Sequence, residues 1–77
     1  MNKARRTRLA SVKEKMEALQ DLLQEILDEE QEAMDNMPES LQGSQRYEAM
    51  EEAVSSLEEA LENIGFAADN IEEAIRE

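Results

Sequence analysis

The 77-residue sequence has the length of a single domain, contains neither cysteine nor histidine, and carries a net charge of −12. This composition excludes disulfides, thiolate metal sites and histidine-dependent catalysis, and no apolar run is long enough for a transmembrane helix or a secretory signal. We therefore expect a cytoplasmic, all-α, non-enzymatic protein without a cofactor, which gains stability by forming oligomers because so short a chain has little core.

The first residues are basic, whereas the rest of the chain is acidic. Residues 1–15 hold six basic side chains and one acidic one, and residues 16–77 hold two basic and nineteen acidic ones. Residues 3–8 form a basic arm that contains Lys3, Arg5, Arg6 and Arg8. The arm has two interpretations: it pairs with acidic residues of the helical bundle, or it binds the phosphates of a nucleotide or nucleic acid. The arm has no interleaved aromatic residues for base stacking, which favours ion pairing.

The first helix is predicted over about residues 3–36, because apolar residues recur there at alternating spacings of three and four, the pattern of a coiled-coil seam. The seam consists of two rows of every seventh residue: Leu9, Met16, Leu23 and Glu30, and Val12, Leu19, Ile26 and Ala33. Glu30 is the misfit. It either reaches solvent near the end of the hairpin, or it sets the register or pairs with a basic residue of a partner.

A loop is predicted over about residues 37–43. Pro38 disfavours helical geometry at the preceding residue, and Gly43 provides a flexible position. Ser44 is the expected N-cap of the second helix. A loop of this length is typical of an antiparallel helical hairpin.

The second helix is predicted over about residues 44–76. Its seam again has two rows: Tyr47, Val54, Leu61, Ala68 and Ile75, and Met50, Leu57, Ile64 and Ile71. Four alanines in strict seven-residue register lie beside them and form the alanine ladder: Ala53, Ala60, Ala67 and Ala74. A seam and a ladder together are wide enough to contact two neighbours, which predicts a four-helix bundle made by a homodimer. The predicted oligomer interface is Leu19, Leu23, Ile26, Ala53, Leu57, Ala60, Leu61, Ile64, Ala67, Ile71 and Ala74.

Matching the seams across the loop predicts that Leu23 lies opposite Leu57, Leu19 opposite Leu61 and Met16 opposite Ile64. The same register would place the basic arm beside Glu72, Glu73 and Glu77.

Phe66 falls on the outer face of the second helix, directly after Gly65, which weakens a helix by about 1 kcal/mol relative to alanine. Two interpretations remain open. Phe66 is a contact residue for a partner, or the helix bends at Gly65 and Phe66 packs on a second protomer.

The segment from Asp28 to Val54 resembles small acidic helical proteins of unknown function from phages and mobile elements of Gram-positive bacteria. The resemblance covers roughly residues 25–75, centres on Asn36-Met37-Pro38 and Gly43-Ser44, and transfers no catalytic residue. It implies a phage or mobile-element setting for the chain.

The leading functional hypothesis is a homo-oligomeric protein–protein interaction module. The second is an acidic, anti-CRISPR-like inhibitor that imitates nucleic acid and binds a basic host protein, such as a defence or DNA-binding enzyme. The third is a nucleotide or nucleic-acid binder that uses the basic arm. Candidate partner-binding residues are Phe66, Glu30, Arg5, Arg6 and Arg8, and no membrane partner is expected.

Overall fold

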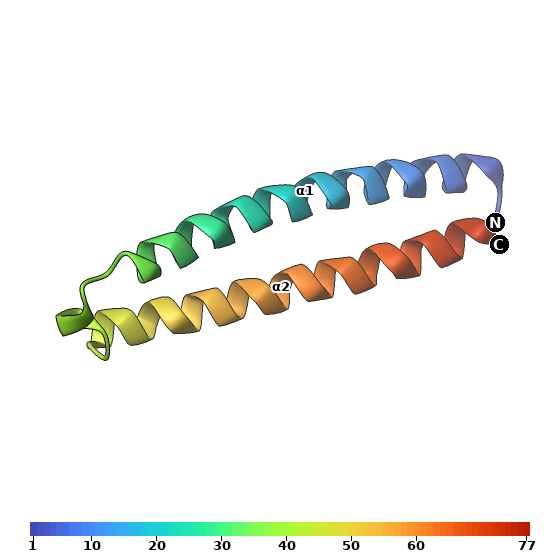
Figure 1. Ribbon diagram of the computed structural model, residues 1–77. Helices are drawn as coiled ribbons and strands as arrows, with labels where there is room; N and C mark the ends of the chain where they lie inside the picture. Colours follow the sequence, from blue (N-terminus) through green and yellow to red (C-terminus); the bar gives the residue numbers. More distant parts are fainter.

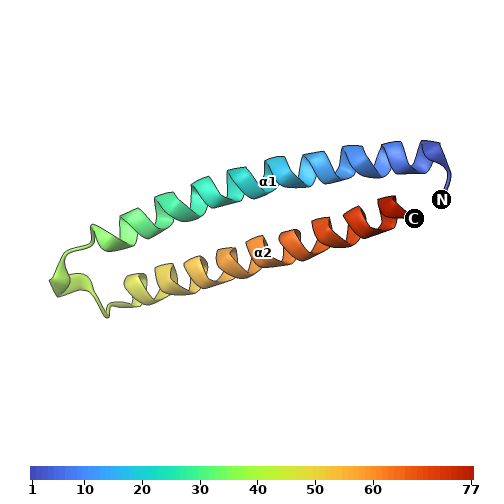
Figure 2. The same ribbon diagram turned by 45° about the vertical axis from the view of Figure 1, so that its right-hand side comes forward.

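The computed structural model describes all 77 residues and contains two long helices, α1 (Lys3–Asp35) and α2 (Gln45–Arg76). The helices run side by side in opposite directions, with both termini at one end and the loop at the other (Figure 1). They remain adjacent when the molecule is turned (Figure 2), and the hairpin measures 59 × 14 × 12 Å. The predicted all-α hairpin is thus confirmed. Neither helix carries an apolar stretch of the length that crossing a bilayer requires.

Side-chain caps fix where each helix begins. The Asn2 side chain accepts a hydrogen bond of 2.8 Å from the backbone N–H of Arg5 and so caps α1, a role that the sequence analysis did not assign. Ser44 caps α2 by accepting a hydrogen bond of 3.2 Å from the N–H of Tyr47, as predicted. Each cap satisfies an N–H that has no partner within its helix.

The loop between the helices is short and partly helical. α1 ends before Pro38, and a single 3₁₀ turn, Glu39–Leu41, follows. Gly43 then adopts a φ of +91°, the left-handed conformation that glycine tolerates best. This turn brings Ser44 into position to start α2 antiparallel to α1.

α2 turns both of its predicted seam rows toward α1. The most buried residues of this helix are Val54 and Ala68, and most of the remaining seam residues are half-buried. The predicted inward face of the second helix is therefore the observed one.

α1 is rotated relative to the prediction. The row of Leu9, Met16 and Leu23 faces α2, as expected, but the second inward row lies on its other side: Lys13, Gln20, Leu27 and Met34. Leu27 is only 5% exposed, whereas Leu19 of the predicted row is 53% exposed. The apolar arc of α1 is wider than one neighbouring helix can cover, so the hairpin buries one side of it and leaves the Val12 row outside.

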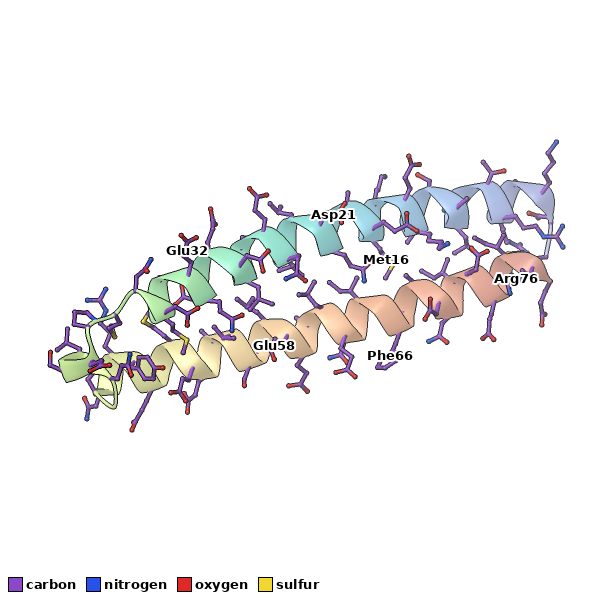
Figure 3. All side chains as sticks on the ribbon, viewed as in Figure 1. Met16, Asp21, Glu32, Glu58, Phe66 and Arg76 are labelled. Atoms are coloured by element: carbon purple, nitrogen blue, oxygen red, sulfur yellow. The ribbon has the colours of Figure 1, made fainter.

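The register also differs from the prediction, by about one helical turn. Lys13 Nζ lies 2.8 Å from Glu72 Oε2, and a Cβ added to Gly65 would lie 3.4 Å from Gln20 Nε2. This register places Met16 opposite Ala68 rather than Ile64, and Figure 3 shows Met16 between the helices. The small residues Ala68 and Gly65 leave room for Met16 and Gln20, whereas the predicted register would have set Met16 against Ile64.

Candidate interaction surface

One side of the hairpin combines the exposed row of α1 with the alanine ladder of α2. Each residue of the Val12 row (Val12, Leu19, Ile26 and Ala33) comes one position before a residue of the inward Lys13 row in the sequence. Likewise, each alanine of the ladder comes one position before a residue of the inward Val54 row (Val54, Leu61, Ala68 and Ile75). In an antiparallel pair, these two rows border the core on the same side. The half-buried state of Ala60, Ala67 and Ala74 agrees with this position beside the core. We call this side the apolar flank, which comprises Val12, Leu19, Leu22 and Ile26 of α1 and Ala53, Ala60, Ala67 and Ala74 of α2.

The apolar flank exposes large side chains that nothing in the chain covers. Leu22 is 52% exposed and Ile26 42%, and both lie in the middle of α1 near Leu19. Leu22 was not among the predicted interface residues. The sequence signal that could have identified it is its position three residues after Leu19, because residues at this spacing lie on the same side of a helix. Large apolar side chains exposed on one side in this way are typical of surfaces that contact another molecule.

Acidic side chains are almost excluded from the apolar flank. The row beside the ladder, Ala49, Ser56, Asn63 and Asn70, is uncharged. Only Glu29 and Glu77 fall on the rows that form this side of the hairpin, and all the other acidic residues lie on the remaining rows of the two helices or in the loop. Asp21 and Glu32, for example, point away from α2 in Figure 3. The hairpin therefore has one apolar side and a strongly negative remainder.

The basic arm lies at the open end of the hairpin. Arg6 is half-buried and donates a hydrogen bond to the main-chain oxygen of Glu77, whereas Arg5 and Arg8 are exposed. None of the three arginines forms an ion pair with a side-chain carboxylate. The basic residues that do so are Lys13 and Arg76. The predicted position of the arm beside Glu77 is thus confirmed for Arg6. The predicted pairing with Glu72 and Glu73 is wrong, because the register brings Glu72 to Lys13 instead.

The Lys13–Glu72 pair is the one ion pair between the helices. Its hydrogen bond lowers the pKa of the Glu72 carboxyl and raises the pKa of the Lys13 ammonium group. Glu17 lies 3.6 Å from Lys13, and Arg76 lies 3.6 Å from Glu72, so both partners have a second opposite charge nearby. The network lies at the open end of the hairpin, where its Lys13–Glu72 contact joins the two helices.

Glu30 and Phe66 keep distinct positions outside this network. Glu30 is half-buried on the inward side of α1 and forms no ion pair within the chain. Phe66 is 59% exposed and points away from α1 in Figure 3. α2 continues as one α-helix through Gly65. No group of acidic side chains converges in a geometry suited to a metal ion.

No protein-family model, curated protein or solved structure matches the chain.

Proposed function

We propose that the protein is a non-enzymatic interaction module in which two hairpins associate through their apolar flanks into a four-helix bundle. The observation that supports this most strongly is the coincidence on one side of the exposed row of α1, the alanine ladder of α2 and an almost complete absence of acidic residues. An acidic chain that needed only solubility would have no reason to keep nearly all of its acidic residues off one side.

Burial of this flank provides the driving force for association. Full burial of a leucine or isoleucine side chain contributes about 1.5–3 kcal/mol, and Leu19, Leu22 and Ile26 keep about half of their surface available. The alanines let a second helix approach closely, which adds dispersion contacts. Together these terms act against the repulsion between two chains of charge −12.

The test is a pair of glutamate substitutions on opposite sides of the hairpin. Leu19→Glu places a charge within the apolar flank, and Phe66→Glu changes a comparably exposed apolar residue on the outer side of α2. Sedimentation at micromolar concentration should show a dimer for the parent and for Phe66→Glu, and a helical monomer for Leu19→Glu. A helical parent that sediments as a monomer would refute the proposal.

A second candidate function is inhibition of a basic protein by imitation of nucleic acid. Its support is the segregation of the acidic residues onto the sides of the hairpin away from the apolar flank, which leaves a negative surface free in a dimer. The predicted phage or mobile-element origin is compatible with it but rests on the resemblance alone. Inhibition of a purified DNA-binding nuclease, relieved by added duplex DNA and by salt, would support this function; no binding to basic proteins at low salt would contradict it.

A further inference from the structure

The charge of the hairpin is distributed unevenly along its length. At the open end, residues 1–15 and 66–77 carry seven basic and five acidic side chains, a net of +2. At the loop end, residues 25–55 carry one basic and ten acidic side chains, a net of −9. Because the molecule is 59 Å long, the two ends are separated by several Debye lengths at physiological salt, where the Debye length is about 8 Å. In a dimer, the charges at each end of one hairpin therefore interact mainly with the charges at the adjacent end of the other hairpin.

We infer that the two hairpins associate head to tail, with their loops at opposite ends of the bundle and α1 packed against α1 of the second copy. This inference rests on the proposed dimer and specifies its geometry. The alternative arrangement places both loops at the same end and packs α1 on α2 of the second copy. It would set two ends of charge −9 against each other, whereas the head-to-tail arrangement sets each of them against an end of charge +2.

The charged residues that border the apolar flank fit the same geometry. Lys15 precedes Leu22 by seven residues on one row, and Glu29 follows it by seven. A twofold axis that crosses α1 near Leu22 therefore brings Lys15 of each copy toward Glu29 of the other. In the alternative arrangement, both residues face the uncharged rows of α2.

The alanine ladder is compatible with this twofold axis. The register of the hairpin puts Asn63 at the level of Leu22, so the axis crosses α2 between Ala60 and Ala67. Ala60 then lies opposite Ala67 of the second copy, and Ala53 opposite Ala74. Small side chains meet small ones along α2, and large ones meet large ones along α1.

The first test measures the distance between the two loops. Leu41 lies in the loop and is exposed, and the chain has no native cysteine, so Leu41→Cys accepts a single spin label. Pulsed dipolar spectroscopy should give a long separation, approaching the 59 Å length of the hairpin. A short separation in a dimer would overturn the head-to-tail inference and leave the proposed function intact, whereas a monomer would refute both.

The second test uses charge reversal. Glu29→Lys and Glu25→Lys each make the chain two units less negative, but Glu25 lies on the exposed outer side of α1. In the head-to-tail dimer, Glu29→Lys faces Lys15 of the second copy and should raise the dimer dissociation constant several-fold, whereas Glu25→Lys should lower it. The inference fails if both variants tighten the dimer equally.

Discussion

The two glycines of the chain have different conformational requirements. Gly43 has a φ of +91°, in a region that side chains with a Cβ rarely adopt. Gly65 lies within α2 with ordinary helical geometry, and its neighbour on α1 is the end of the flexible Gln20 side chain. Its identity as glycine is therefore not required by the backbone.

We predict that Gly65→Ala stabilises the hairpin by up to about 1 kcal/mol, because alanine favours the helix and the added Cβ makes an ordinary contact with Gln20. Gly43→Ala is the matched control and should destabilise the protein by roughly 1–2 kcal/mol, because it forces a left-handed alanine. Urea unfolding followed by circular dichroism measures both. A loss of stability in Gly65→Ala would mean that the Gln20 side chain cannot move aside.

The Lys13–Glu72 pair predicts a specific dependence of stability on pH. The folded-state pKa of Glu72 lies below its ordinary value of 4.5, so its contribution is present above that pH and is lost as the pH falls through the folded value. The pKa of Lys13 lies above 10.5, so the contribution is complete below that pH and is lost as the pH rises further.

We expect Glu72→Gln to lower the thermal midpoint at neutral pH and to have no effect in strong acid. Glu73→Gln removes the same charge from an exposed neighbour without a basic partner, and it should not lower the midpoint at any pH. A midpoint difference between parent and Glu72→Gln that persists in strong acid would show that the carboxylate form does not supply the stabilisation.

At the scale of the element, α1 has two sides that can each serve as a seam. The spacing of apolar residues revealed the helix and its apolar arc, but it could not give the rotation of α1 in the hairpin. The Val12 row holds four apolar residues and the Lys13 row two, so counting favours the wrong row. In the structure the Lys13 row faces inward: Leu27 is buried, Lys13 meets Glu72, and Gln20 lies beside Gly65.

The two sides of α1 should respond differently to loss of a leucine side chain. Leu27→Ala removes a buried side chain of the hairpin and should cost about 2–4 kcal/mol whether or not the protein dimerises. Leu22→Ala alters the exposed side and should reduce stability only at concentrations where the dimer forms. Thermal unfolding over a range of protein concentrations separates the two effects. An equal loss for Leu22→Ala in dilute solution would place Leu22 in the hairpin core.

At the scale of the whole molecule, the sequence was sufficient for the hairpin and its two helices because caps, Pro38 and heptad spacing act locally. Register was not predictable from spacing alone, since shifting one helix by about a turn keeps apolar rows in contact. The apolar flank was partly predicted, through the alanine ladder, Leu19 and Ile26. Its position on one side of the hairpin depends on the rotation of α1, which only the structure provides.

The same whole-molecule charge distribution leads to a prediction about salt. Two chains of charge −12 repel each other, and the opposite ends of a head-to-tail dimer offset only part of this repulsion. Salt screens these exposed charges but leaves the burial of the apolar flank largely intact. We therefore expect the dimer dissociation constant to fall as sodium chloride is raised from low to physiological concentration. Sedimentation equilibrium measures this change, with Leu19→Glu as the control that stays monomeric. A dimer that dissociates as salt increases would show that attraction between charges, rather than burial of the apolar flank, holds the two copies together.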